Sequence, residues 1–122
     1  MEVVRIFTGD DGESQLERIE IPLEGSGVGL VSPLAKAAGV LFRDTVPIDL
    51  GYHTAPRRQF VINMGGETEL EVADGSTARV ADGGIIFAED VTGHGHLTRS
   101  PTGCRTVCIE MPDDFDITQW RK

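Results

Sequence analysis

Imidazoles occur at only three positions in this chain of 122 residues: His53, His94 and His96. An imidazole can bind a metal ion, transfer a proton near neutral pH, or orient a ligand through a hydrogen bond. Gln59 and Asn63 follow His53 in an apolar segment, and their spacing of four residues places both amides on one face of a strand. Because an unpaired amide in an apolar core costs roughly 1–3 kcal/mol, we expect this face to line a cavity.

The segments around these residues have the pattern of short strands. Residues 59–64 are apolar except at Gln59 and Asn63. Within residues 67–73 the acidic side chains Glu67, Glu69 and Glu71 alternate with Thr68, Leu70 and Val72, and glycine-containing turns lie between such segments. No stretch of residues 40–111 has a sustained helical period, which argues against a parallel α/β fold. We therefore predict seven to nine short antiparallel strands in a barrel or sandwich. We also predict one or two helical turns in residues 34–38, which lie between Ser32-Pro33 and Gly39.

Composition limits the class of protein. With 11 Lys and Arg against 20 Asp and Glu, the net charge of -9 argues against nucleic acid and against an anionic membrane surface as partners. No secretory signal or membrane-length apolar run is visible, so a cytoplasmic location is expected. Cys104 and Cys108 are expected to be two small apolar side chains on one face of a strand, with a redox or metal-binding pair as the alternative.

Residues 51–66 carry a spacing that resembles the first motif of the cupin superfamily. That motif runs His-x-His, three or four residues, Glu, six residues, Gly. His53 takes the first His position, Ala55 the second, Gln59 the Glu position and Gly66 the Gly position. The spacing is kept while two of the three ligand types have changed.

Residues 83–96 resemble the second cupin motif, which has Gly-Asp, a short apolar strand, Pro, a turn and a metal-binding His. Gly84 replaces the Asp and Glu89 replaces the Pro. The His is His94 by strict count, or His96 if the loop holds two extra residues. Residues 55–61 and 89–96 further resemble a group of small bacterial single-domain cupins, in which His96 matches the loop His, so we prefer His96.

The resemblance implies an all-β fold, the cupin-type double-stranded β-helix or jelly-roll barrel, with the short helical segment near the N-terminus. We expect one domain over residues 1–122: N-terminal strands and a loop in 1–39, a barrel core in about 40–111, and a tail in 112–122. The apolar face that carries Phe60, Ile62 and Met64 is expected to pack against the second sheet or a partner subunit.

The family's ligand positions point into the barrel, so the resemblance implies that His53, Gln59 and His96 face its interior. With Asn63 on the same strand face as Gln59, and with Arg43 joining from the preceding strand, these residues are expected to form a pocket. Two imidazoles and one carboxylate are a usual site for iron, manganese, nickel or zinc. Here the metal ligands would be His53, Gln59 and His96, with Glu89 or Asp90 as substitutes. Because Gln59 is a neutral amide, a pocket without metal is the favoured alternative.

Two functions compete at this stage. The first is the binding of a small molecule in the cavity. The second is an enzyme that uses His53 and His96, either as a divergent metal-dependent dioxygenase or isomerase or as a metal-free acid–base catalyst. An interaction protein with a vestigial pocket is a third possibility. A homodimer is expected, with the first residues and the tail around Trp120 exchanged between subunits.

Overall fold

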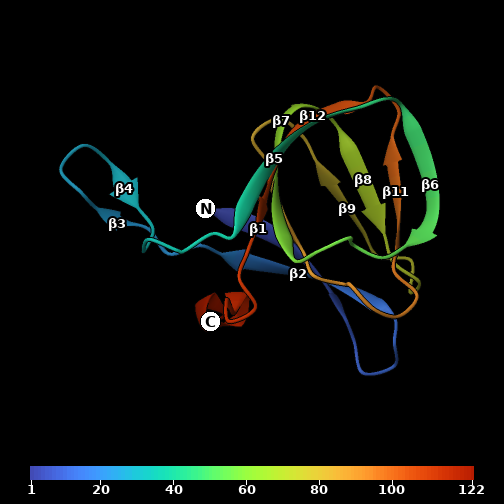
Figure 1. The fold of residues 1–122 in the computed structure, drawn as a ribbon, viewed down its shortest axis with the longest axis horizontal. Coiled ribbons are helices and arrows are strands. Elements are labelled where there is room, and N and C mark those ends of the chain that lie inside the picture. The colour runs from blue at the N-terminus through green and yellow to red at the C-terminus, as the bar shows by residue number, and fades with distance from the viewer.

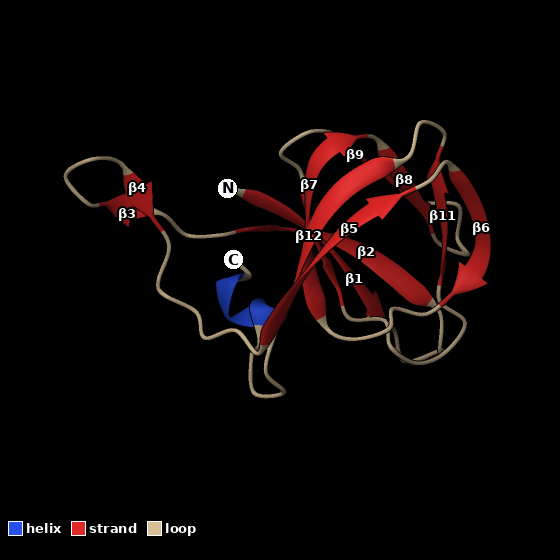
Figure 2. Ribbon diagram, turned by 45° about the horizontal axis from the view of Figure 1, so that its top comes forward, coloured by secondary structure: helices blue, strands red, loops and turns tan.

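A computed structural model describes the whole chain, Met1–Lys122, as two facing β-sheets and a small projecting hairpin (Figures 1 and 2). In order across the larger sheet, its six strands are β2 (Ser14–Glu20), β1 (Glu2–Thr8), β10 (Ile85–Ala88), β7 (Gln59–Gly66), β12 (Cys104–Glu110) and β5 (Gly39–Thr45). The smaller sheet has the order β6 (Ile48–His53), β11 (His96–Ser100), β8 (Thr68–Glu71) and β9 (Thr77–Val80). The hairpin pairs β3 (Glu24–Gly25) with β4 (Leu30–Val31).

Strand pairing brings the two histidine segments together. Every strand pair is antiparallel except β1 with β10. In the smaller sheet β11 lies between β6 and β8, and His96 is paired with His53. In the larger sheet Gln59 is paired with Ala88 on one side and Glu110 on the other. The first residues of β7 and β11 therefore come from different sheets but face the same interior.

The all-β class is correct, whereas the closed jelly-roll barrel is not: the two sheets do not join into a closed barrel. At one side β5 pairs only with β12 and β6 pairs only with β11, although two residues, Val46 and Pro47, connect β5 to β6. At the other side β2 and β9 are also terminal strands. Closure would require hydrogen bonds between these edge strands, and none are formed.

The helical segment expected near the N-terminus is absent. Residues 34–38 are not helical, and the one helical element is a 3₁₀ turn, η1 (Ile117–Trp120). Five residues cannot repay the cost of helix nucleation unless packing supports them. Leu34, the apolar residue that would anchor such a helix, is fully exposed. Asp116 caps η1, because its carboxylate accepts a hydrogen bond from the Thr118 amide.

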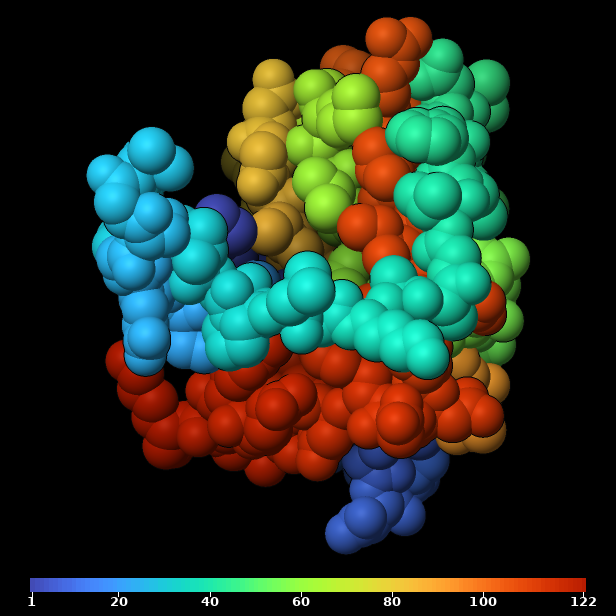
Figure 3. All heavy atoms as spheres, turned by 60° about the vertical axis from the view of Figure 1, so that its left-hand side comes forward, coloured from blue at the N-terminus to red at the C-terminus, as the bar shows by residue number.

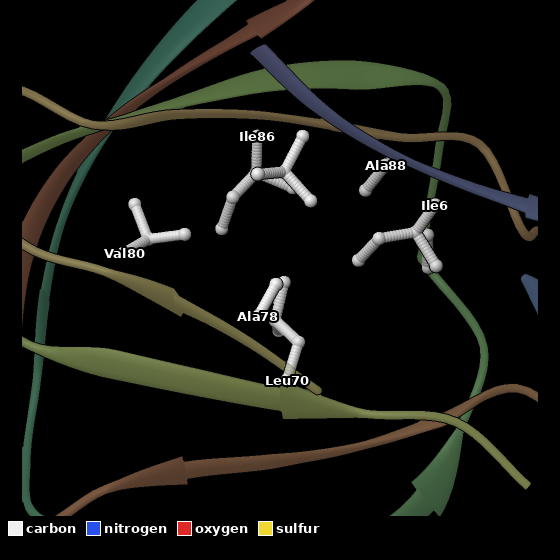
Figure 4. Packing of buried hydrophobic residues seen from close by; sticks show 8 residues of the cluster. Ile6, Leu70, Ala78, Val80, Ile86 and Ala88 are labelled. Carbon is white, nitrogen blue, oxygen red and sulfur yellow. The ribbon is translucent and has the colours of Figure 1, made fainter. Parts of the chain in front are cut away.

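Two hydrophobic clusters stabilise the fold. The inner cluster fills the space between the two sheets, and Figure 4 shows its side chains pointing toward one another from both sheets. The outer cluster lies on the opposite face of the larger sheet, where Phe60 contacts Phe87 at a ring-centroid distance of 4.7 Å and Phe115 at 5.7 Å. The C-terminal segment, residues 112–120, thus covers the face around Phe60, and neither the second sheet nor a partner is needed there. Met64 remains exposed.

A charged network ties the C-terminal segment to the sheet. Arg58 donates to the carbonyls of Pro112, Asp113 and Phe115 and forms an ion pair with Glu89. Glu89 also pairs with Arg5 at 2.6 Å. Because these side chains are mostly shielded from solvent, the carbonyls that Arg58 binds rely on it as their hydrogen-bond donor.

Other sequence features have simple structural roles. Both cysteines are free, with Cys108 buried and Cys104 half-buried on β12. Glu69 and Glu71 of β8 form ion pairs with Arg99, and Glu67, just before β8, pairs with Arg79. No helix of the structure is long and apolar enough to cross a membrane.

Candidate functional site

A cavity of about 270 Å³ lies between the two sheets. Residues of the inner cluster and the apolar residues Ile48 and Leu50 of β6 form a large part of its wall, and several Thr and Ser side chains also line it. The five residues predicted to form a pocket all line this inter-sheet cavity: Arg43, His53, Gln59, Asn63 and His96. They come from β5, β6, β7 and β11, so the site depends on both sheets.

The buried carboxylate of Asp90 fixes the orientation of His96. Its Nδ1 lies 2.5 Å from Asp90 Oδ2, and the same oxygen accepts a hydrogen bond from Ser14 Oγ at 2.7 Å. Asp90 is fully buried and its Oδ1 has no hydrogen-bond partner. Since the carboxylate occupies Nδ1, the ring is fixed in one orientation and Nε2 is the nitrogen left for a ligand.

His53 is fixed in the same manner by the backbone. Its Nδ1 lies 2.8 Å from the carbonyl of Gly51. A carbonyl only accepts, so Nδ1 carries the proton and the neutral ring has an acceptor lone pair on Nε2. The rings of His53 and His96 lie 4.6 Å apart between centroids, tilted by 53°. The cavity therefore has two neighbouring imidazoles, each with its Nδ1 already engaged.

Gly95 permits this close approach. Its φ is +84°, a conformation that glycine adopts without cost. A Cβ at this position would overlap the carbonyl group of His53 and would lie 2.8 Å from the Thr54 nitrogen. The loop before β11 can thus lie directly against the end of β6, which is what brings His96 beside His53.

The polar residues on β7 are less free than their sequence pattern indicated. Gln59 is buried, and its Oε1 accepts a hydrogen bond from Arg57 at 3.0 Å. Asn63 donates to the carbonyls of Gly66 and Val80 and accepts from the Gly65 amide. Asn63 therefore stabilises the irregular end of β7 and has little capacity left for a ligand.

Arg43 and His94 occupy different surroundings. Arg43 is exposed at the open side of the cavity, and its side chain makes no hydrogen bond or ion pair within the chain. His94 lies outside the cavity, where it is exposed, stacks on Tyr52 at 3.9 Å and contacts Glu13. Neither Arg57 nor Arg58 lines the cavity.

The residues at the site do not fit a divalent metal ion. No group of three or more His, Cys, Asp and Glu side chains is arranged to hold one. Glu89 is paired with two arginines, and Asp90 lies behind His96, so neither supplies the missing carboxylate. The third donor would be the Gln59 amide oxygen, which already faces the Arg57 guanidinium, and a second cation there would be repelled.

The positioning roles of Asp90 and Ser14 were missed by sequence reasoning. Asp90 was considered only as a substitute metal ligand, and Ser14 was not considered because it lies on β2, far from both motifs. The six-residue spacing between Asp90 and His96 across a glycine-rich loop was the available signal, since such a loop can fold back on itself.

Neither a family model nor a curated protein matches the chain. Among solved structures, protein NMB1881 from Neisseria meningitidis is similar, with 23% sequence identity and a TM-score of 0.49 over 60% of this chain and 72% of that chain. The assignment to the all-β class rests on the strands described above and not on this likeness.

Proposed function

We propose that this chain binds a small, largely apolar molecule in the inter-sheet cavity and recognises a hydrogen-bond donor on it. The observation that carries the proposal is the pair of imidazoles, each with Nδ1 engaged and Nε2 left for a ligand, at the wall of an apolar cavity. In the neutral rings both Nε2 atoms are acceptors, and such a pair favours a hydroxyl or another N–H or O–H group as its partner.

The cavity limits the size of this ligand. Its volume of about 270 Å³ lies just below the roughly 300–1,000 Å³ that is usual for ligand pockets. It corresponds to roughly nine times the volume that one water molecule occupies in the liquid. A single substituted ring or a short branched chain fits this space, whereas a nucleotide or an oligosaccharide does not.

The proposal includes a distant relationship to the cupins. Two segments that resemble the cupin motifs each supply one histidine, and these histidines are partners on adjacent strands of one sheet. Gln59 replaces the carboxylate of the first motif, which agrees with a site that binds an organic ligand without a metal ion. This relationship concerns the two motifs and does not imply a closed barrel.

Matched aromatic probes test the binding proposal. Phenol and benzene differ by one hydroxyl, and a hydrogen bond worth about 0.5–1.5 kcal/mol predicts roughly 2- to 13-fold tighter binding of phenol. His53→Leu is expected to remove most of this preference, while His94→Leu, at an exposed histidine outside the cavity, should keep it. Equal affinities for the two probes, measured by calorimetry on wild-type protein, would refute the proposal.

Metal analysis provides an independent check. Protein purified without chelator or added metal is expected to contain no stoichiometric metal. Stoichiometric iron, manganese, nickel or zinc that disappears in His53→Ala would count against direct recognition of an organic ligand.

A second function is favoured by the contact between Asp90 and His96. A buried carboxylate that orients an imidazole is a common arrangement for a general base, because it stabilises the ring after proton uptake. His96 would then remove a proton from a bound carbon acid through Nε2. The exchange of α-protons of cyclohexanone in D₂O, followed by NMR, tests this function. Faster exchange with wild-type protein and with His94→Gln than with His96→Gln would support it, and equal rates would exclude it.

A further inference from the structure

A projecting arm leaves the body of the molecule between β2 and β5. It comprises residues 22–38 and includes the β3–β4 hairpin, whose tip stands apart from both sheets (Figures 1 and 3). Val28 and Leu34 are fully exposed, and Leu30 and Val31 are 65% and 53% exposed. A two-stranded hairpin with no packed face is only marginally stable in water, so the arm requires a surface that covers it.

Most of the arm carries no charge, in a chain that is otherwise rich in charge. Residues 25–35 include no Asp, Glu, Lys or Arg, although charged residues make up 25% of the sequence. Two copies of a protein with a net charge of -9 repel each other over most of their surfaces. An uncharged apolar segment is one through which two such copies can approach without that repulsion.

The outer edge of β5 presents the matching surface. β5 pairs with β12 on one side and with no strand on the other. Its Val40 and Phe42 are 61% and 77% exposed, and Met64 of β7 is 55% exposed. The nearby charges of Asp44 and Arg105 neutralise each other in an ion pair. This edge strand is unpaired and partly apolar, and Arg43 is its one charged side chain without an ion-pair partner. An unpaired edge of this kind is a template for a strand from another chain.

The arm of the same copy does not cover this edge. It runs into β5 at Gly39 after Ala38 donates to the Glu110 carbonyl. Because no turn separates the end of the arm from β5, the arm continues the strand and does not lie beside it. The arm of a second copy has no such constraint. Its seven residues 32–38, beyond the hairpin, extend up to about 23 Å, which matches the roughly 23 Å of the seven residues of β5.

We propose that two copies of this chain associate reciprocally, with the arm of each lying along the β5 edge of the other. The same edge borders the open side of the inter-sheet cavity, where Arg43 and Leu50 both line the cavity and are exposed. The arm of the partner therefore covers the mouth of the cavity, and each cavity is completed only in the dimer. This assembly uses a different segment from the N-terminal strand and the Trp120 tail, which pack within their own chain.

Light scattering and sedimentation on the full chain test the proposal. Wild-type protein is expected to be a dimer. Leu30→Glu on the arm and Phe42→Glu on the edge should each raise the dimer dissociation constant by tenfold or more, because each places a carboxylate in an apolar contact. Val91→Glu is the matched control, since Val91 is an exposed apolar residue outside both surfaces, and it should leave the dimer intact.

Mixing the two variants identifies the contact. A dimer of one Leu30→Glu copy and one Phe42→Glu copy retains one unmodified arm on one unmodified edge, so the mixture should form more dimer than either variant alone. Amide hydrogen exchange should slow in β5 and in residues 26–35 only when the dimer forms. A wild-type monomer would overturn the proposal. A dimer that survives either substitution would do the same, as would a mixture that recovers no dimer.

Discussion

Replacing Gly95 by alanine isolates the contact that brings the two imidazoles together. Gly95 has a φ of +84°, and Gly75, in the turn between β8 and β9, has a φ of +89°. An alanine costs about 1–2 kcal/mol at either position, because an L-residue is strained in the left-handed region. The two sites differ in their surroundings, since a Cβ on Gly75 meets no atom within 4 Å.

At Gly95 the added Cβ must displace backbone. It would overlap the carbonyl of His53, which belongs to β6 and cannot rotate away as a flexible side chain would. Overpacking of this kind typically adds about 1–3 kcal/mol. The expected loss in the free energy of unfolding is therefore about 2–5 kcal/mol for Gly95→Ala, compared with about 1–2 kcal/mol for Gly75→Ala.

Urea unfolding followed by circular dichroism measures both losses, with the slope of the transition checked for each variant. NMR provides a local measurement, because the ring protons of His53 and His96 are close enough in the wild-type protein for a nuclear Overhauser effect. We expect Gly95→Ala to weaken that effect and Gly75→Ala to keep it. Equal losses of stability in the two variants, with the ring contact preserved in both, would refute the packing argument.

Three further predictions concern polar groups. The hydrogen bond from Arg121 lowers the pKa of Glu17 below its ordinary value of 4.5. The ionised Glu17 therefore stabilises the folded state above that pH, and this stabilisation is lost as the pH falls through the lowered pKa. The stability difference between wild type and Glu17→Gln, measured by urea unfolding, should shrink below about pH 4.5. Arg58→Met should lower the free energy of unfolding by about 1.5–3 kcal/mol, because carbonyls of the C-terminal segment lose their hydrogen-bond donor. Arg105→Met removes an exposed ion pair and should lower it by about 0–1 kcal/mol in the same assay. Asp90→Asn should cost about 1.5–3 kcal/mol through the loss of a charge-assisted hydrogen bond, and an unchanged urea midpoint would show that the buried carboxylate does not hold the ring.

The strands and the meeting of the two histidines were predictable because both depend on local rules. Alternation along residues 59–64 placed Gln59 and Asn63 on the inner face and Phe60 on the other, as the burial of these side chains shows. The strict spacing of the second motif indicated His94, whereas the resemblance to the small single-domain cupins favoured His96, which is paired with His53. These inferences require only the two-residue period of a strand and an aligned loop.

Sheet closure, the missing helix and the role of Asp90 depend on contacts between distant segments. Hydrogen-bond pairing between β5 and β6 depends on how the two whole sheets pack against each other, which the sequence of neither strand determines alone. Residues 34–38 have helix-forming side chains but nothing to pack against, so the prediction of a helix from propensity alone was wrong. Ser14, Asp90 and His96 come together from three separate parts of the chain.

The position of Asp90 changes how the lost carboxylate of the first motif is interpreted. Gln59 removes a negative charge from the cavity wall, while Asp90 places one directly behind His96, out of reach of any bound molecule. The charge therefore acts on the imidazole and not on the ligand. A wall with acceptor nitrogens and no exposed carboxylate disfavours a dication and accommodates a neutral donor, and the open side carries the unpaired Arg43. Under the proposed function, a ligand whose hydroxyl lies at the two imidazoles satisfies the inner end of the cavity, while Arg43 stays at the mouth.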